Sequence, residues 1–319
     1  MKKWRMSLSN KLRNSIFSFV VLVLLFVIWY QVNSDSSWPE MQFVAAFEGV
    51  IEHPADIAFE KDRFWIAEIF SKHLMTKSEL NEKDQLAYKK SNNMKLKSPH
   101  FIAASHDGLY VSEGWGDGVV FFPFDDLSKP AKVPFPEKLK APHGICLDND
   151  WLYVADSLNS RIIRLNLETQ EYQVFKDNEE RVSYVRQILC RVDGVGLSNS
   201  YERREGLNVG NGSNVLLIAD FNSGLTEIIA EFTDTNITGI SVIDDKLLLV
   251  SRWLGYNDIA MFDLRQKKII GTLDLNNSRL GVPYGIKYYP DSKYLFVSFL
   301  GEIIKKSHKG GVLQFKVND

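Results

Sequence analysis

Three residues that could coordinate a metal ion recur at similar places in a repeating sequence: His100, His143 and Asp193. Imidazole and carboxylate groups are the ligands that zinc, calcium and manganese use in proteins. The spacing is not a metal-binding motif in itself, because the three residues lie far apart in the chain. They can share one divalent ion, calcium or zinc, only if the fold returns them to one point. In the alternative interpretation, His143 begins a strand after a proline and its imidazole caps a neighbouring turn.

A second group of residues could bind an organic ligand: Glu113, Trp115, Arg252 and Trp253. Arg252 stands where other repeats have an acid, so it could anchor a ligand carboxylate or form a structural ion pair. Trp115 lies in the segment GWGDG, which offers little to bury an indole ring. Acids at these positions could instead accept hydrogen bonds from turns, and the aromatic rings could pack between repeats.

The elements that must position these residues are strands in a repeat of roughly 40–50 residues. HPADIAFEKDRFWIAE (53–68), SPHFIAASHDGLYVSE (98–113) and APHGICLDNDWLYVAD (141–156) each contain a proline, an apolar strand, a polar turn and a second strand that ends in an acid. The later chain repeats this pattern more loosely, with a polar loop expected at 198–214. The sequence therefore predicts an all-β fold, a six-bladed β-propeller of four-stranded blades over residues 41–319.

In a propeller, two sets of positions converge at the mouth of the central channel, namely the blade starts and the ends of the second strands. The predicted blade starts are Ala55, His100, His143, Asp193, Thr238 and Tyr284. The predicted ends of the second strands are Glu68, Glu113, Asp156, Asp220, Arg252 and Phe299, with the aromatic residues Phe70, Trp115, Phe221, Trp253 and Tyr256 just beyond several of them.

Closure of the ring is expected to involve both ends of the propeller. Residues 41–48 precede the first full repeat and could supply the outer strand of the last blade, paired with 311–318. An open ring would expose a sheet edge, which invites aggregation. We therefore expect residues 41–48 to be the closing strand.

The segment 141–169 resembles an NHL repeat in its Pro-x-Gly-Ile opening, its Tyr-Val-Ala-Asp centre and the Asn-x-Arg that follows. More distantly, the chain resembles gluconolactonase-like propellers, since Glu52-His53-Pro54 matches the Glu-x-Pro that carries their metal glutamate. That resemblance implies further ligand positions near His143 and Asp193, but also at Thr238, which is a poor replacement for a carboxylate. Strictosidine-synthase-like propellers are similar in combining an N-terminal anchor with six blades. These families differ widely in activity, so the resemblance implies a fold rather than one function.

The N-terminus predicts a membrane anchor. Residues 1–14 form a basic tail, 15–32 are almost wholly apolar, and 33–40 form a linker. Basic residues precede the apolar segment and the next one follows only at Lys61, so we expect the tail in the cytoplasm and the propeller outside it. The alternative is a cleaved signal peptide, which would leave a secreted or periplasmic protein.

Charge excludes one class of partner. Residues 1–30 carry five basic side chains and no acid, whereas the whole chain has a net charge of −2, so residues 31–319 carry −7. An acidic domain is a poor ligand for phosphate backbones, and we expect no nucleic-acid partner. Cys146 and Cys190 fall at different places in their predicted repeats, and we expect two buried free thiols.

Together these features predict a membrane-anchored, extracytoplasmic propeller that binds a protein, a peptide or a small ligand at its channel mouth. The alternative hypothesis is a metal-dependent hydrolase, similar to a lactonase, or a lyase with its site at the same mouth. The sequence does not decide whether the protein is an enzyme, and it indicates no cofactor beyond the divalent ion of that alternative.

Overall fold

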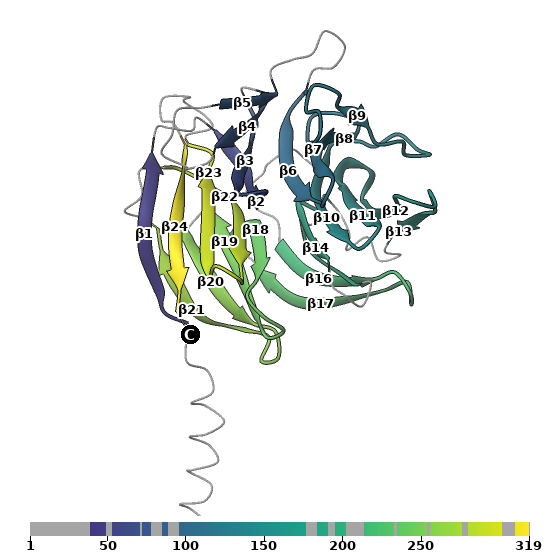
Figure 1. Cartoon of the computed structure of the whole chain (residues 1–319). Coiled ribbons are helices and arrows are strands. Elements are labelled where there is room, and N and C mark those ends of the chain that lie inside the picture. Colours follow the sequence, from purple (N-terminus) through teal and green to yellow (C-terminus); the bar gives the residue numbers. More distant parts are fainter. Residues whose placement is uncertain are drawn as a thin grey trace, which may run out of the picture. The chain divides into compact units, whose positions relative to one another are not determined.

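The computed structural model describes residues 39–48, 53–70, 72–77, 85–88, 96–176, 184–190, 195–201, 214–232, 235–253, 256–275, 280–301 and 310–318. These residues form six antiparallel sheets of four strands each (Figure 1). The compact unit that contains them spans Glu40–Asp319. The structure is thus an all-β propeller of four-stranded blades, as predicted.

Each blade runs from an inner strand to an outer strand. The first blade contains β2 (Pro54–Glu60), β3 (Arg63–Glu68), β4 (His73–Lys77) and β5 (Gln85–Tyr88); the second contains β6 (Pro99–Ala104), β7 (Gly108–Glu113), β8 (Val119–Pro123) and β9 (Ala131–Lys132). The third contains β10 (Pro142–Asp148), β11 (Trp151–Asp156), β12 (Arg161–Asn166) and β13 (Tyr172–Phe175); the fourth contains β14 (Gln187–Cys190), β15 (Val195–Tyr201), β16 (Asn214–Asp220) and β17 (Leu225–Phe232). The fifth contains β18 (Asn236–Val242), β19 (Leu247–Trp253), β20 (Asp258–Asp263) and β21 (Lys268–Asp274); the sixth contains β22 (Pro283–Tyr289), β23 (Tyr294–Phe299), β24 (Gly311–Val317) and β1 (Met41–Glu48).

The inner strands form a closed ring. Neighbouring blades contact each other through β2, β6, β10, β14, β18, β22 and again β2. The last blade is completed by β1, which pairs with β24 in a register from Met41 opposite Val317 to Glu48 opposite Gly311 (Figure 1). This is the predicted closing strand, and it covers the edge that β24 would otherwise expose.

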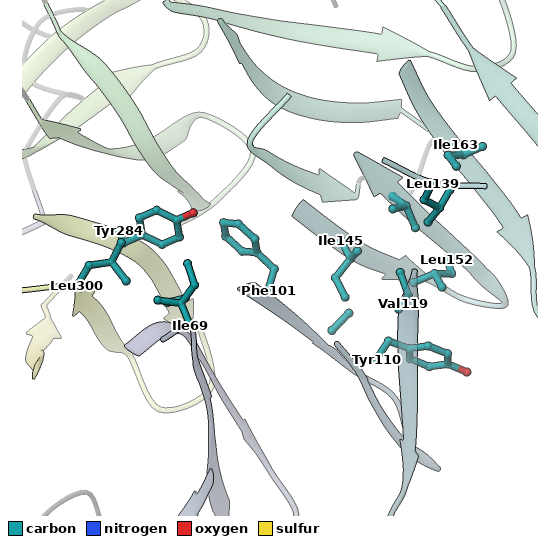
Figure 2. Close-up of a cluster of buried hydrophobic side chains, with 13 residues drawn as sticks. Ile69, Phe101, Tyr110, Val119, Leu139, Ile145, Leu152, Ile163, Tyr284 and Leu300 are labelled. Atoms are coloured by element: carbon teal, nitrogen blue, oxygen red, sulfur yellow. The ribbon is translucent and has the colours of Figure 1, made fainter. Parts of the chain in front are cut away.

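Apolar side chains hold neighbouring blades together. Figure 2 shows one buried cluster, in which Tyr284 and Leu300 of the sixth blade belong to the same group as Phe101 of the second blade and Leu152 of the third. Sheets packed face to face bury both sides of their central strands, and all six residues of β7 are buried. This explains why the inner and central strands read as nearly continuous apolar runs in the sequence.

The fourth blade differs from the prediction. Its inner strand β14 begins at Gln187, and its second strand is β15, which overlaps the loop expected at 198–214. Asp220 therefore ends the third strand, β16, and lies on the opposite side of the ring from the ends of the second strands. The repeat is degenerate here, and the apolar run of β16 with its terminal acid has the sequence pattern of a second strand.

The prediction of free thiols is wrong. Cys146 and Cys190 form a disulfide, with their Cα atoms 5.7 Å apart. Because the fourth blade starts earlier than predicted, both cysteines lie on inner strands, β10 and β14, and these strands are neighbours in the ring. The disulfide links the third blade to the fourth.

The predicted anchor at 15–32 lies outside the described residues. In the part of the chain that is described, no helix has the length and apolarity needed to span a membrane.

Candidate functional site

The blade starts share a backbone irregularity that sets the direction of one side chain. In five blades the pairing between the first two strands shifts register just after the opening residue, at Pro54, Pro99, Pro142, Ile237 and Pro283. Such bulges bend a strand and re-aim the residue that they contain. The residues held there are Ala55, His100, His143, Thr238 and Tyr284, which are the predicted blade-start residues of those blades.

In the fourth blade, Arg186 occupies the position predicted for Asp193. The N–H of Gly144 donates to Arg186 O at 2.8 Å, and at the sixth blade start a Cβ on Gly285 would lie 2.5 Å from Ala55 O, the carbonyl of the next blade start. Asp193 follows the end of β14 and lies outside the described residues, as does Glu52. The sequence held a signal for Arg186, because it follows His143 by the same interval that separates His143 from His100.

His100 and His143 lie side by side, with ring centroids 4.7 Å apart and both side chains 2% exposed. Each ring is fixed through Nδ1. His100 Nδ1 donates to Ser98 O at 2.9 Å, and His143 Nδ1 donates to Ala141 O at 2.8 Å. A carbonyl only accepts, so Nδ1 carries the proton and Nε2 carries a lone pair in both rings.

The surroundings keep both rings neutral. Burial lowers the pKa of His100 to about 3, with a further effect of the positive charge on Arg186. Burial also lowers the pKa of His143 well below its usual value, and repulsion from a protonated His100 and from Arg186 acts in the same direction. Arg186 lies over the ring of Tyr284, 4.9 Å from its centroid. The blade starts therefore place two neutral imidazoles beside one guanidinium group.

A metal site at these residues stays a prediction. Two neutral imidazoles with Nδ1–H bonded to carbonyls have the protonation state that a metal ligand requires. Among the residues that the structure describes, no group of three or more His, Cys, Asp or Glu side chains could hold an ion. The hydroxyl of Thr238, the poor replacement for a carboxylate, donates to Pro283 O at 2.6 Å.

The turn after β7 presents Trp115 to solvent, and the side chain is 73% exposed. Backbone hydrogen bonds brace this turn on both sides. Gly114 N–H donates to Ser98 O at 2.9 Å, Gly116 N–H donates to Glu113 O at 2.6 Å, and Ala141 N–H donates to Gly116 O at 3.2 Å. The indole ring thus stands on a turn that is fixed to the starts of the second and third blades.

The acids at the ends of the second strands brace the mouth rather than form an open ring of carboxylates. Asp156 is fully buried and accepts hydrogen bonds from Lys140 N–H at 2.7 Å, Asn159 Nδ2 at 2.7 Å and Arg161 Nε at 2.6 Å. Glu113 Oε1 accepts from Lys97 N–H at 2.8 Å. The backbone donors of Lys140 and Lys97 lie in the loops that enter these two blades. The prediction expected hydrogen bonds only from the turn that follows each acid.

Glu113 is less completely bonded than Asp156. Its Oε2 is buried and finds no hydrogen-bond donor among the described residues. Burial raises the pKa of Glu113, and the hydrogen bond from the backbone N–H of Lys97 lowers it to a smaller extent.

Arg252 and Trp253 lie in the fifth blade, and two blades separate them from Glu113 and Trp115 in either direction around the ring. The four predicted ligand-binding residues are therefore not brought to one point. Arg252 pairs with Asp258, Nε to Oδ1 at 2.8 Å and Nη2 to Oδ2 at 2.5 Å, in the geometry of a structural ion pair. Its guanidinium also lies 4.1 Å from the ring centroid of Tyr256.

Three lysines near Trp115 were missed in the sequence. Lys97, Lys132 and Lys138 surround the carboxylate of Asp117 on the same turn as Trp115. They come from separate loops and one short strand, so no spacing in the sequence indicates that they meet.

The comparisons with known proteins concern the fold. No protein-family model matches the chain, and no curated protein matches its sequence. The chain is similar in structure to the WD40 repeats of RRP9, with a TM-score of 0.61 and 9% identity over 88% of this chain and 100% of that chain. A structure of U3-55K gives a TM-score of 0.60 and 10% identity over the same shares. A chain of a nidogen–laminin complex gives 0.57 and 14% identity over 75% of this chain and 84% of that chain. At these identities the likeness establishes a β-propeller and nothing finer.

Proposed function

We propose that this protein is a membrane-anchored, extracytoplasmic propeller, six-bladed and NHL-like, that binds a protein or peptide partner at its mouth face. The mouth face is the side of the ring that carries the blade starts and the turns after the second strands. The observation that carries this proposal is the 73% exposure of Trp115 on a turn that backbone hydrogen bonds hold in place. Exposed tryptophans on fixed turns are typical anchors of protein interfaces.

Other apolar side chains at equivalent turns enlarge this face. Phe70 follows β3 and is 42% exposed, Leu158 follows β11 and is 51% exposed, and Tyr256 follows β19 and is 45% exposed. Because all these turns join a second strand to a third strand, they lie on one side of the ring. A partner that covers several of them would bury an aromatic and aliphatic surface with a polar rim.

Two features support the extracytoplasmic side. Basic residues flank the apolar segment 15–32 closely only on its N-terminal side, since the next one is Lys61, and this favours a cytoplasmic N-terminus. The disulfide between Cys146 and Cys190 is of the kind that persists in oxidising compartments.

Site-specific photo-crosslinking tests the binding function. A photo-reactive residue at position 115 of the full chain, expressed in cells, is expected to form a discrete adduct with a partner protein. Position 225 is the matched control, because Leu225 is 69% exposed but lies after the third strand of its blade, on the opposite face. The same adducts from both positions, or none from position 115, would contradict the proposal.

The metal-dependent hydrolase is the second candidate, and the neutral imidazole pair of His100 and His143 favours it. Elemental analysis of the purified full chain tests it directly. This candidate requires a stoichiometric divalent ion that is lost in a His143→Ala variant. If the protein binds no ion, the candidate is excluded, and the binding function is unaffected.

A further inference from the structure

Three lysines converge on one carboxylate beside Trp115. Asp117 Oδ1 lies 3.2 Å from Lys97 Nζ and 2.9 Å from Lys132 Nζ, and Asp117 Oδ2 lies 3.7 Å from Lys138 Nζ. Lys97 precedes β6, Lys132 ends β9, and Lys138 lies in the loop before β10. We call Lys97, Lys132, Lys138 and Asp117 the basic cluster.

The basic cluster has more positive than negative charge. Three ammonium groups share one carboxylate, and the lysine side chains are 50%, 51% and 75% exposed. The nearest other acids do not balance them: Glu137 is paired with Arg161, and Glu113 is buried with a raised pKa. Residues 31–319 have a net charge of −7, so the basic cluster is a local positive region on an acidic domain.

The same turn carries both the exposed ring and the carboxylate on which the three lysines converge. Asp117 lies two residues after Trp115, and Glu113 N–H donates to Gly118 O at 3.1 Å across the turn. A turn that is fixed before binding loses little conformational entropy when a partner arrives. Trp115 and the basic cluster are thus a preformed surface with one apolar element and one cationic element.

We propose that this surface recognises an acidic segment of a partner protein, in which carboxylates face the basic cluster and one aromatic or aliphatic side chain packs against Trp115. The inference rests on the proposed binding function and specifies the chemistry of its partner. Carboxylates of the partner are the complement of the three ammonium groups, and they compete with Asp117 for them.

A membrane surface fits less well. Recognition of anionic lipids usually requires clusters of four to eight Lys or Arg, and the strong negative surface potential belongs to the cytoplasmic leaflet. The basic cluster has three lysines, with a carboxylate at its centre. A peptide segment can place its carboxylates around Asp117, whereas a uniformly anionic surface faces that carboxylate directly.

A peptide library provides the test with the full chain in detergent micelles. One library of nonapeptides carries Asp or Glu at five positions and Phe, Tyr, Trp or Leu at a sixth, and a second library replaces the acids with Lys or Arg. The immobilised chain is expected to enrich peptides from the acidic library only. For a selected peptide, fluorescence anisotropy is expected to show an affinity that falls as salt rises, since exposed charges are screened.

Variants then locate the contact. Lys132→Gln is expected to weaken binding about two- to fivefold, in the range of an exposed ion pair, and Trp115→Ala about thirtyfold, as for an interface anchor. Lys267→Gln is the matched control: Lys267 is 50% exposed and pairs with Glu227 at 2.7 Å, but it lies in the turn after β20, on the opposite face. The Lys267→Gln variant should bind the selected peptide with the same affinity as the unaltered protein.

Three results would overturn the proposal. Enrichment of basic peptides would assign the opposite chemistry to the surface. Binding to vesicles that contain phosphatidylserine, lost with Lys132→Gln and without peptide enrichment, would assign it to lipid. Failure to enrich either library, while position 115 still forms crosslinks, would reject an acidic segment and leave the proposed binding function standing; loss of the crosslinks as well would reject both.

Discussion

The second and third blades begin in the same way but end their second strands differently. His100 and His143 are bonded alike through Nδ1 to a carbonyl two residues earlier, and both rings are buried in the channel. Glu113 and Asp156 occupy equivalent places opposite the opening prolines of their blades. Asp156 has hydrogen bonds to both oxygens, whereas Glu113 Oε2 has none among the described residues.

The difference follows from the residue that stands opposite the acid. In the third blade Arg161 stands opposite Asp156 and binds it. In the second blade Ser112 pairs with Val119, so the place opposite Glu113 belongs to Gly118, which has no side chain. The fifth blade has the same ion pair with its signs exchanged, since Arg252 stands opposite Asp258. The third and fifth blades thus have a buried ion pair between the end of the second strand and the third strand. The described part of the second blade has no such pair, and its turn carries Trp115 and Asp117 of the basic cluster.

The two buried histidines at the starts of the second and third blades predict the largest effect, which is a loss of stability in acid. Both histidines have a pKa below that of the unfolded chain, so the unfolded state binds more protons and stability falls as pH drops from about 6.5 towards about 3. Each histidine should contribute a slope of about 1.4 kcal/mol per pH unit. Urea unfolding between about pH 5 and pH 7.5, with a chelator present, measures this slope.

Single variants separate the two histidines. His100→Gln and His143→Gln should each remove about half of the slope, because both rings are buried and both are bonded through Nδ1 to a carbonyl. A slope that only one of the variants changes would show that the blade starts are not alike.

Removal of the acid in the third blade predicts the next largest effect. Asp156→Asn should destabilise the propeller by about 3 kcal/mol, because it leaves the buried Arg161 with a weakened partner. The change removes a charge but not volume, so packing is unaltered. Thermal unfolding measures the effect. A loss below about 1 kcal/mol would mean that Glu137, the other partner of Arg161, suffices to hold it.

The regular blades explain how much of the fold could be predicted. The prolines and acids of the first three repeats, and the apolar strands between them, identified the propeller and the closing strand because they recur with a nearly constant period. The fourth blade broke that period. Its start at Val185-Arg186-Gln187 has neither proline nor glycine, so Asp193-Gly194 resembles a blade start more closely than Arg186 does, and the disulfide cannot be predicted from that alignment.

The parts of the site that depend on equivalent positions in the repeat could be predicted from the sequence. The parts that depend on side chains from unrelated loops meeting in space could not. His100 and His143 meet because equivalent positions of neighbouring blades meet, and this follows from the repeat. The ion pair of Arg252 with Asp258 and the meeting of three lysines at Asp117 depend on side-chain directions and loop paths. Neither leaves a periodic signal in the sequence.

Two glycines of the same turn test how tightly the mouth is built. A Cβ at Gly114 would lie 2.2 Å from His100 Nδ1, whereas a Cβ at Gly118 would meet nothing within 4 Å. Gly114→Ala should therefore displace the His100 ring and cost about 1–3 kcal/mol. Gly118→Ala is the matched control and should change stability by less than about 0.5 kcal/mol. Equal effects of the two variants in thermal unfolding would show that the turn yields and does not hold His100 in place.

The smallest effect is expected at Glu113, and it is the counterpart of the Asp156 variant. Burial raises the pKa of Glu113 above that of the unfolded chain, so the carboxyl contributes stability in acid that is lost as pH rises through its folded pKa. Glu113→Gln keeps an acceptor for Lys97 N–H and removes the buried charge at neutral pH. The free energy of unfolding should change by less than about 1 kcal/mol, against about 3 kcal/mol for Asp156→Asn. Urea unfolding of both amide variants at about pH 7 makes the comparison. A loss at Glu113 as large as that at Asp156 would place a partner on Oε2 from outside the described residues, and the two blades would then be braced in the same way.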